Sequence, residues 1–402
     1  MSDPEAQTFV ISLDGWAHGG EAVGRLPDGR ACFVPYAIPG ETVEVRIRTQ
    51  HKRHVTADLL NVVEPSPHRV QPPCPYYGSC GGCQLQHVAV DHQLSLKQRV
   101  LTEQLQRIGK EADPPVRGVS GPVGAWPQEY RVWARMAVDP QGRLGFRMPR
   151  SHQVQAVAEC LLFTPETQRL RETAGDDWAG ADEVMLMAGD GGTMISVSGP
   201  AQVAGSSQGS VRMQVGAENF TASAGAFFQA GPAGALALAQ AVIRVAEVRA
   251  GDRVLDLYSG VGLLSVFLAR AGASVVAVES NAVAAADAVS NCANQDVTVL
   301  TATVEEALAG VSMGGVSMGG VSGDVDLVVL DPPRSGAKAQ VCSRMADLAP
   351  RRIIYVACDP AALARDTLTL RQHGYRLTSV DGLDLFGHTA HVEAVASFVQ
   401  VG

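Results

Sequence analysis

A cysteine and an aspartate stand where two apolar segments of the C-terminal half end, and both are suited to covalent chemistry. The segments VDLVVLDPPRSG (325–336) and RIIYVACDPAALARD (352–366) each predict a strand, which ends at Asp331 in the first and at Cys358 in the second. In open α/β sheets ligands bind at the carboxyl ends of the strands, so both side chains are expected at one edge. A helix that begins near Pro360 would direct its N-terminus towards the thiol and favour the thiolate. We therefore predict that Cys358 is a nucleophile. The alternative is that it is a small buried apolar residue, as most lone cysteines in strands are.

A reaction that proceeds through a thiolate adduct also needs a base, and the segment DLFGHTAHVEAVASF (384–398) supplies candidates. Glu393 lies on the predicted last strand, and His388 and His391 precede it. Carboxylates and imidazoles both serve as general bases, so the residue types alone leave these three open.

The segment VLDLYSGVGLLSVFLA (254–269) predicts a strand, a tight glycine turn and a helix, which together form a cofactor site. Gly260 and Gly262 allow the backbone to turn sharply and bring a ligand close to the helix N-terminus. Glu279 ends the next predicted strand, where a carboxylate can accept both hydroxyls of a ribose. Ser265 replaces the third glycine of a dinucleotide-binding turn, so S-adenosylmethionine, which has no pyrophosphate, fits better than NAD.

Three cysteines near residue 80 are spaced as metal ligands. Cys74, Cys80 and Cys83 follow a C-x5-C-x2-C pattern around two glycines. A fourth ligand must come from elsewhere, and the candidates are Cys160, His87 and Cys32. Spacing does not separate zinc from an iron–sulfur cluster, because both accept four thiolates. Cys292 and Cys342 are expected to be structural.

The N-terminal segment has the pattern of a small β-barrel. Short alternating stretches occupy residues 7–64, and the turn GRLPDGR (24–30) carries an Asp-Gly hairpin signal. The stretch EVRIRTQHKRH (44–54) brings four basic residues together, namely Arg46, Arg48, Lys52 and Arg53. We interpret them as a phosphate-contacting patch, the alternative being an edge strand protected by charge.

The remaining chain divides into two parts after a proline-rich linker at 64–75. A helix is expected from Leu94 to Ile108, and residues 130–215 form β-rich segments with turns. From about residue 230, strands alternate with Ala/Leu-rich helices, which is typical of a doubly wound parallel sheet. The predicted fold class is thus an α/β Rossmann-like domain with a small N-terminal β-barrel and a β-rich central domain. The domain boundaries are 1–64, 65–228 and 229–402, and the repeat GVSMGGVSMGGVSG (310–323) is expected to be a surface loop.

Composition limits the possible classes of protein. The 402 residues carry a net charge of −9, and no apolar run reaches the length of a membrane span. The polar, acidic start MSDPEAQTFV lacks the features of a secretory signal, so a cytoplasmic protein is expected. An acidic chain binds nucleic acid only through a local basic face. Eight cysteines are too sparse for a disulfide scaffold.

Taken together, these segments resemble the iron–sulfur type of 5-methyluridine RNA methyltransferases over nearly the whole chain. FVPYAIPGETVEVRI (33–47) looks like the family's RNA-binding TRAM domain, and PPCPYYGSCGGCQLQH (72–87) looks like its cluster motif. The catalytic motifs of the family match, in order, FFQ (227–229), DLYSGVG (256–262), DPPRSG (331–336), ACDPAALARD (357–366) and HVE (391–393).

The resemblance implies transfer of a methyl group from S-adenosylmethionine to C5 of a uridine in RNA. C5 of uracil is a poor nucleophile, and addition of a thiolate at C6 activates it. By this likeness Cys358 is the nucleophile and Glu393 the base that removes the C5 proton. The residues that contact the cofactor or the uracil are then Gln229, Tyr258, Glu279 and Asp331. A [4Fe–4S] cluster is expected on Cys74, Cys80, Cys83 and Cys160.

The sequence departs from the family pattern at a few positions. Leu263 replaces a common Asn, and Ala357 and Asp359 replace Ser and Asn beside the nucleophile. Two other classes stay open: an RNA-binding protein without turnover, and a methyltransferase that acts on a small heteroaromatic metabolite. The leading substrate is 23S ribosomal RNA, transfer RNA is the close alternative, and a monomer without membrane contact is expected.

Overall fold

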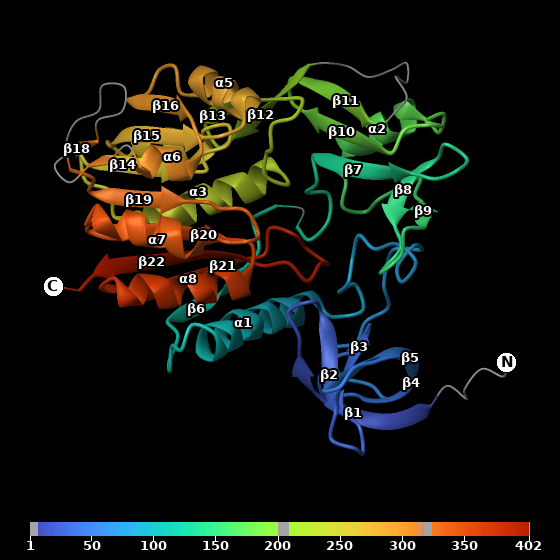
Figure 1. The fold of residues 1–402 in the computed structure, drawn as a ribbon. Coiled ribbons are helices and arrows are strands. Elements are labelled where there is room, and N and C mark those ends of the chain that lie inside the picture. The colour runs from blue at the N-terminus through green and yellow to red at the C-terminus, as the bar shows by residue number, and fades with distance from the viewer. Residues whose placement is uncertain are drawn as a thin grey trace.

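The computed structural model describes residues 7–124, 126–199, 209–309, 311–312, 315–316 and 324–401. In it the chain forms a barrel, a central sheet and a large C-terminal sheet (Figure 1). No described helix is long and apolar enough to cross a membrane. Most of the repeat at 310–323 lies outside the described residues, apart from a short ladder between β17 (Val311–Ser312) and β18 (Gly315–Val316).

The N-terminal strands close into a barrel in the order β1-β2-β3-β5-β4, which confirms the predicted β-barrel. The strands are β1 (Thr8–Trp16), β2 (Glu21–Arg25), β3 (Ala31–Pro35), β4 (Thr42–Gln50) and β5 (His54–Glu64). Alternate residues such as Val34, Val43 and Val45 are fully buried, because successive side chains of a strand point to opposite faces. Arg46 and Arg48 lie 3.9 and 3.7 Å from the carboxylate of Asp58, so the basic patch is partly paired on the barrel itself.

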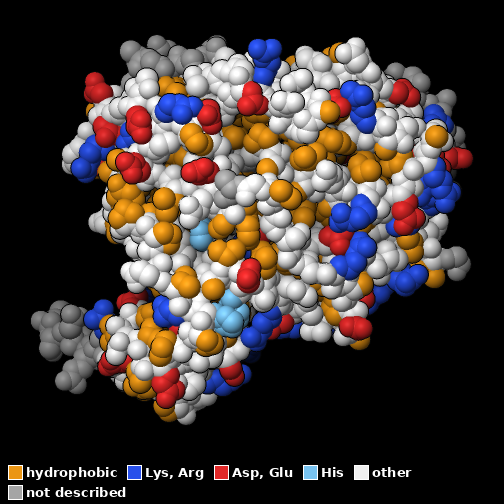
Figure 2. All heavy atoms as spheres, turned by 180° about the vertical axis from the view of Figure 1, so that it is seen from behind, with side chains coloured by type: hydrophobic (Ala, Val, Ile, Leu, Met, Phe, Trp, Pro, Cys, Tyr) orange, Lys and Arg blue, Asp and Glu red, His pale blue; other side chains and the backbone are white. Residues whose placement is uncertain are grey.

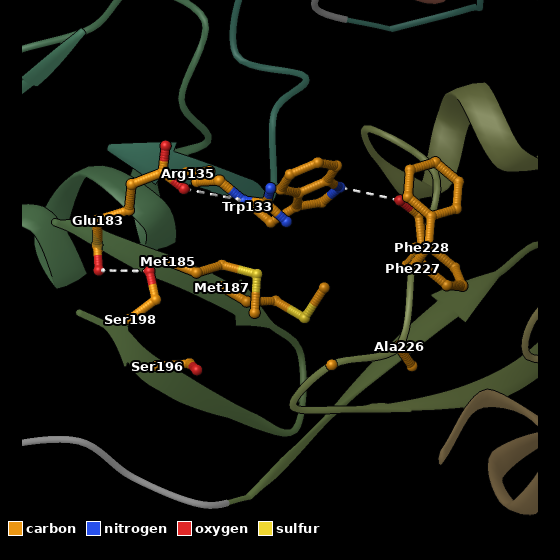
Figure 3. A pocket seen from close by; sticks show the side chains of 11 residues that line it. Trp133, Arg135, Glu183, Met185, Met187, Ser196, Ser198, Ala226, Phe227 and Phe228 are labelled. Carbon is orange, nitrogen blue, oxygen red and sulfur yellow. Dashed lines mark hydrogen bonds and ion pairs between the residues drawn. The ribbon is translucent and has the colours of Figure 1, made fainter. Parts of the chain in front are cut away.

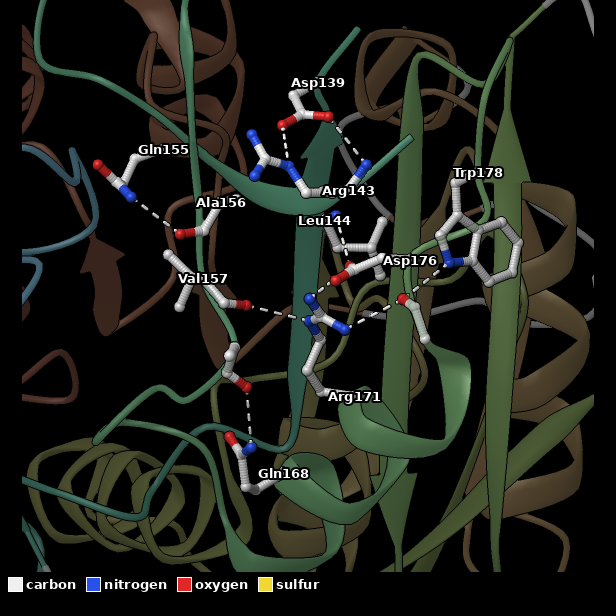
Figure 4. A network of polar contacts seen from close by, with 12 residues as sticks. Asp139, Arg143, Leu144, Gln155, Ala156, Val157, Gln168, Arg171, Asp176 and Trp178 are labelled. Atoms are coloured by element: carbon white, nitrogen blue, oxygen red, sulfur yellow. Dashed lines mark hydrogen bonds and ion pairs between the residues drawn. The ribbon is translucent and has the colours of Figure 1, made fainter. Parts of the chain in front are cut away.

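The central sheet has the strand order β11-β10-β7-β8-β9. Its strands are β7 (Trp133–Val138), β8 (Leu144–Arg147), β9 (Val154–Ala156), β10 (Glu183–Gly189) and β11 (Gly192–Ser198), and α2 (Pro165–Ala174) packs on β10. A polar network fixes this layer (Figure 4). The buried Arg171 donates to Val157 O (3.1 Å), Gly175 O (3.1 Å) and Asp176 Oδ1 (2.7 Å). Asp176 in turn accepts from the backbone of Leu144, so the helix, β8 and the following turn form one rigid unit.

The C-terminal sheet contains eight strands in the order β16-β15-β14-β19-β20-β22-β21-β6. They are β14 (Arg253–Leu257), β15 (Ser274–Glu279), β16 (Val297–Thr301), β19 (Leu327–Leu330), β20 (Arg352–Ala357), β21 (Tyr375–Leu383), β22 (Glu393–Gln400) and β6 (Val116–Ser120). The strands β14, β19 and β20 are almost continuously buried, as expected for parallel strands covered on both faces. The prediction of an α/β Rossmann-like domain is confirmed.

Helices cover both faces of this sheet. One face packs against α3 (Pro232–Ala246) and α4 (Leu263–Arg270). The other face packs against α1 (Val90–Arg107), α6 (Val304–Ala309), α7 (Lys338–Asp347) and α8 (Pro360–Gln372). The hairpin of β12 (Ser210–Val215) and β13 (Glu218–Ser223) packs on α5 (Ala282–Asn291), where Asn291 accepts from the backbone of Thr221.

The segment between the barrel and the central sheet returns to the C-terminal sheet. Helix α1 lies beside α8, and β6 pairs in parallel with β21 at the sheet edge. A buried ion pair fixes this arrangement: Lys97 Nζ lies 2.6 Å from Asp384 Oδ1, and the two side chains are 1% and 0% exposed. Residues near 90–120 are therefore structurally part of the C-terminal layer.

Breaking this ion pair should destabilise the protein strongly. Lys97→Met leaves the carboxylate of Asp384 buried without its cation, which reduces the free energy of unfolding by roughly 3–5 kcal/mol. Urea denaturation followed by circular dichroism measures the change. The control is Arg169→Met, which removes the exposed pair with Glu166 on α2 and should change stability by about 1 kcal/mol or less. Equal losses in the two variants would contradict the assigned importance of the buried pair.

Candidate active site

Cys358 and Glu393 lie side by side at one edge of the C-terminal sheet. Strand β22 runs antiparallel to β20, and Ala357 pairs with Ala394. Cys358 follows Ala357 and Glu393 precedes Ala394, so both residues lie at the end of this ladder, and the carboxylate of Glu393 is close enough to raise the pKa of the Cys358 thiol. Glu393 is only 4% exposed, and its Oε1 has no hydrogen-bond partner among the described residues. Cys358 is half-buried and lines a cavity.

Asp331 follows β19 and lies at the same edge. Its backbone N–H donates to Leu257 O (3.2 Å), which fixes the start of the DPPR loop against β14. The side-chain amide of Gln229 donates to Asp331 Oδ2 at 3.5 Å, the long end of a hydrogen bond. Burial raises the pKa of Asp331 to about 7. Two of the residues chosen from sequence are thus in contact, although they are separated by about a hundred positions.

The protonation state of Cys358 differs from the sequence-based expectation. Burial, together with the carboxylates of Glu393 and Asp331, raises the pKa of this thiol to about 12, and Arg334 opposes the shift. Burial and the neighbouring carboxylates outweigh the expected effect of the helix N-terminus. The way this helix is capped is part of the reason. Asp359 is the N-cap of α8, and its own carboxylate accepts from Ala362 N (2.7 Å). The prediction that the helix N-terminus holds Cys358 as a thiolate was wrong.

Glu393, the carboxylic acid close to this thiol, is also held towards its neutral form. Burial raises the pKa of Glu393 well above its usual value, Asp331 adds to the shift, and Arg334 opposes it. Two carboxyl groups and a thiol therefore share a poorly hydrated site with one guanidinium. Such perturbed groups clustered in a cleft are typical of catalytic sites.

A cavity of about 350 Å³ gives access to the thiol. It is lined by residues from all three parts of the chain: His18, Gly19, Gln84, Arg334, Cys358, Asp359, Ala390 and His391. Arg334 Nη2 lies 3.3 Å from His391 Nε2, and burial lowers the pKa of His391 to about 4, so this imidazole is neutral. His388 does not line the cavity and instead contacts Gln93 of α1. Of the three candidate bases, Glu393 and His391 are near the thiol.

The glycine turn after β14 meets Glu279 as expected. Gly260 and Gly262 have φ values of 55° and 84°, which glycine adopts readily. Gly260 N donates to Glu279 Oε2 (2.9 Å), and Asn281 N donates to Glu279 Oε1 (2.7 Å), so the carboxylate lies over the turn. A Cβ atom at Gly262 would lie 2.9 Å from Cys292 Sγ, so close packing also requires glycine there.

Tyr258 is placed differently from the other predicted contact residues. Burial raises its pKa to about 12, and the acidic groups that add to the shift are Glu305 and Asp366. It has no hydrogen bond to Gln229, Glu279 or Asp331 in the described part of the chain. Its positive φ of 60° shows that the backbone turns at this residue, directly before the glycine turn.

Four cysteines line one small cavity between the loop at 74–83 and the central sheet. They are Cys74, Cys80, Cys83 and Cys160, and the cavity also contacts Tyr76, Tyr77 and Arg131. The other two candidate ligands are elsewhere: Cys32 is in the barrel core, and His87 uses both ring nitrogens, on Tyr77 and Ala37. Among the described side chains, no three His, Cys, Asp or Glu residues converge closely enough to hold a metal ion. Four sulfurs around one cavity nevertheless match the donor set of a zinc or iron–sulfur site.

Sequence reasoning missed three residues of this region. Gln84 ties the cysteine loop to the segment before Glu393, because its N–H donates to His388 O (3.0 Å) and its Oε1 accepts from Ala390 N (3.3 Å). Arg334, the last residue of DPPR, lies at the mouth of the cavity. Asp256 is fully buried under the glycine turn, where Ser265 Oγ donates to it at 2.5 Å and burial raises its pKa to about 7. The sequence did offer a signal for Asp256, because an acidic residue inside the otherwise apolar strand VLDL (254–257) is unusual.

Two protein families and several curated relatives match this chain, and the relatives match nearly its whole length. The model of the family tRNA (Uracil-5-)-methyltransferase matches residues 210–400, and that of the TRAM domain matches residues 5–60. A 23S rRNA (uracil(1939)-C(5))-methyltransferase from Alkalilimnicola ehrlichii is 33% identical over 98% of this chain and 96% of its own. An uncharacterized RNA methyltransferase from Streptomyces avermitilis is 34% identical over 97% of this chain and 98% of its own.

One solved structure matches the whole fold. It is the Pyrococcus abyssi tRNA (uracil-54, C5)-methyltransferase in complex with S-adenosyl-L-homocysteine. The TM-score is 0.74 at 24% identity, over 97% of this chain and 100% of the other. At this identity the match concerns the fold alone.

The site predicts slow alkylation of Cys358 in the free protein. With a pKa of about 12, the thiol should react slowly with iodoacetamide at neutral pH, and the rate should still rise at about pH 10. A free cysteine, with a pKa of about 8.5, levels off earlier. Peptide mass spectrometry of the protein quenched at successive times measures the rate at this residue.

A matched pair of variants tests the cause. Arg334→Met removes the cation that lowers the thiol pKa, so Cys358 should react more slowly, whereas Arg344→Met, exposed on α7, should leave the rate unchanged. A rate that levels off near pH 9 in the wild type would show that the thiol is not perturbed in this way.

Proposed function

This chain belongs to the family of RNA uracil-C5 methyltransferases, and on that premise we propose that it methylates C5 of a uridine in 23S ribosomal RNA. The observation that carries the proposal is the proximity of Cys358 to Glu393, at the end of the β20–β22 ladder, and to Asp331. Transfer RNA is the alternative substrate, supported by the match of residues 210–400 to the tRNA (Uracil-5-)-methyltransferase family model.

The proposed reaction begins with the thiol. Cys358 Sγ, as thiolate, bonds to C6 of the uracil, and the electrons of the C5–C6 double bond move into an enolate that makes C5 nucleophilic. S-adenosylmethionine, when bound, supplies an electrophilic methyl group for C5 and a positive charge beside the acidic site. Glu393 then takes the C5 proton, the C5–C6 double bond forms again, and the C6–S bond breaks. The uridine must leave its stack to reach the thiol.

The raised pKa values suit these roles. A carboxylate whose pKa is raised by burial is a stronger base than an exposed one, which favours removal of a proton from carbon by Glu393. A cation bound beside Asp331 and Cys358 lowers the pKa of both, because an opposite charge favours the ionised form. In this proposal the thiol is activated when the site is loaded and is protonated when the site is free.

Other residues are proposed to hold the methyl donor. Glu279 would accept the ribose hydroxyls, in exchange for its hydrogen bonds to the backbone of the glycine turn and of Asn281. Gln229 and Asp331, which contact each other, would bind the methyl donor or the uracil. Tyr258, where the backbone turns, would also contact one of them. The barrel at 1–64 and, of the predicted part at 65–228, the cysteine loop and the central sheet would bind RNA. Residues 229–402 would carry out the transfer, with α1 and β6 packed on their sheet.

We also propose a [4Fe–4S] cluster on Cys74, Cys80, Cys83 and Cys160. Two observations support this proposal. The four residues line one cavity, and Cys160 lines it whereas Cys32 and His87 do not. A cluster would supply a covalent link between the loop at 74–83 and the central sheet. Because Gln84 ties that loop to the segment before Glu393, the link would be structural, and the reaction has no electron-transfer step.

Two substitutions test the covalent mechanism. Cys358→Ala should abolish methylation and leave binding of S-adenosylmethionine unchanged, because it removes only the nucleophile. Glu393→Gln should stop the reaction after methyl transfer and accumulate a protein–RNA adduct on a denaturing gel. The assay uses labelled S-adenosylmethionine with separate ribosomal and transfer RNA pools, followed by nucleoside analysis. Methylation of bulk RNA by the Cys358→Ala variant would overturn the mechanism. Label found only in transfer RNA would overturn the proposed substrate.

The metal proposal has a separate readout. Protein purified without oxygen should be coloured and should contain roughly four iron and four acid-labile sulfide ions per chain. Cys160→Ser should lose iron and melt at a lower temperature, whereas Cys32→Ala, whose side chain is in the barrel core, should keep its iron. Zinc in place of iron would contradict the cluster, and iron retained in Cys160→Ser would contradict the fourth ligand.

A further inference from the structure

A cavity of about 360 Å³ lies on the face of the C-terminal sheet that α3 covers, at the end opposite Cys358. It is lined by arginines from four different elements, namely Arg117 of β6, Arg244 of α3, Arg352 of β20 and Arg376 of β21. These four side chains define the arginine cavity. Arg352 begins β20 and Cys358 follows its end, so the length of the strand, roughly 20 Å, separates the cavity from the thiol. The arginine cavity is therefore distinct from the site of methyl transfer.

One buried carboxylate orients two of these guanidinium groups. Arg117 binds Asp381 in a bidentate pair, with Nε 2.8 Å from Oδ1 and Nη2 donating to Oδ2 at 3.0 Å. Arg244 Nη2 donates to the same Oδ2 at 2.9 Å. Asp381 is 9% exposed, whereas the side chains of Arg117 and Arg244 are 51% and 57% exposed. A guanidinium has five N–H donors, so both arginines keep donors for a ligand.

The other two arginines have donors without partners. Arg352 Nη1 donates to Val245 O (3.0 Å) and to Ser397 Oγ (3.1 Å), and its Nη2 lies 2.7 Å from Glu247 Oε2. Its Nε is buried and has no hydrogen-bond partner among the described residues. Arg376 is exposed, and its side chain forms no ion pair or hydrogen bond within the described part of the chain. Arg376 can therefore bind a ligand without losing a contact of the fold.

The arginine cavity differs in charge from a cavity of the same size on the central sheet. That cavity lies beside Phe227, and the side chains of Arg135 and Glu183, 3.8 Å apart, balance each other in it (Figure 3). In the arginine cavity four cations face only two carboxylates, those of Asp381 and Glu247. A net positive charge remains there, although the whole chain carries a net charge of −9.

These features suit a ligand that carries phosphate groups. Guanidinium groups bind phosphate oxygens through two parallel hydrogen bonds, and the mutual repulsion of four cations is relieved by a bound anion. Ser379, which also lines the cavity, can add a hydroxyl donor. Charges on an edge strand such as β6 also prevent edge-to-edge pairing, but that function requires only exposure and not the convergence of arginines from four elements.

We propose that the arginine cavity binds phosphate groups in the backbone of the substrate RNA, remote from the target uridine. The inference rests on the proposed action on RNA and deepens it, because contacts to phosphates position a nucleic acid without reading its sequence. Three of the four arginines are exposed, so the phosphates of a polymer can reach them. An acidic chain binds RNA only through local basic faces, and this cavity is one. A free anion such as pyrophosphate is the other source of the same chemistry and is an outcome of the test.

The test measures the affinity of the full-length protein for a 23S ribosomal RNA transcript by filter binding at several salt concentrations. Arg376→Met removes one phosphate contact, so binding should weaken roughly five- to eightfold at about 0.1 M salt. The slope of log affinity against log salt should fall by about 1, whereas Arg376→Lys keeps the charge and should keep the slope. Arg344→Met is the matched control, because Arg344 is also an exposed arginine but is on α7, which packs on the other face of the sheet.

Unchanged RNA affinity and slope in Arg376→Met, or an equal loss in Arg344→Met, would overturn the proposal. Pyrophosphate separates the two sources of phosphate. If it raises the melting temperature of the wild type but not of Arg376→Met, while both bind RNA equally, the cavity binds a small anion instead of RNA. RNA affinity is measured without turnover. If the wild type binds the transcript but does not methylate it, the proposed function fails, and the comparison of the Arg376 variants still decides whether the cavity contacts RNA.

Discussion

The antiparallel pairing of β22 with β20 is the constraint on which the site depends. A strand parallel to β20 would carry its first residue to the opposite edge of the sheet, far from Cys358. Because β22 runs in reverse, Glu393 begins where β20 ends, and the thiol and carboxyl become neighbours. A slip of one residue would turn Glu393 to the other face, so the register itself specifies the site. The six pairs between β20 and β22, from Arg352–Val399 to Ala357–Ala394, define that register.

The loop that leads into β22 is held from three directions. Lys97 of α1 pairs with Asp384 in the interior, and Gln84 of the cysteine loop bonds to both His388 and Ala390. The barrel contributes through Gly20, where an added Cβ would lie 2.9 Å from Ala390 Cβ. These contacts explain why the barrel and the cysteine segment lie at the mouth of the cavity: they support the backbone that positions Glu393.

Charge is distributed unevenly between the interior and the surface. Acidic and basic side chains are interspersed on the described part of the face in Figure 2, as suits an acidic chain without a broad basic surface there. The buried edge of the C-terminal sheet instead concentrates Asp256, Asp331 and Glu393, all with raised pKa values. Their ionised forms lack full compensation in the free protein, so a bound cation stabilises them. A positively charged methyl donor has that property.

The sequence by itself determined what depends on local pattern: the closed barrel from alternation, the parallel sheet from apolar runs, and the strand ends at Asp331 and Cys358. The glycine turn and the acid that meets it were also visible, because a tight turn restricts residue type. Only the tertiary structure decided which groups share a cavity and how they titrate. The thiol pKa was predicted in the wrong direction, because burial and two carboxylates from other strands outweigh the nearby helix. The cavity beside Phe227 and the place of Cys160 likewise depend on strand pairing across long sequence separations, which periodicity does not encode.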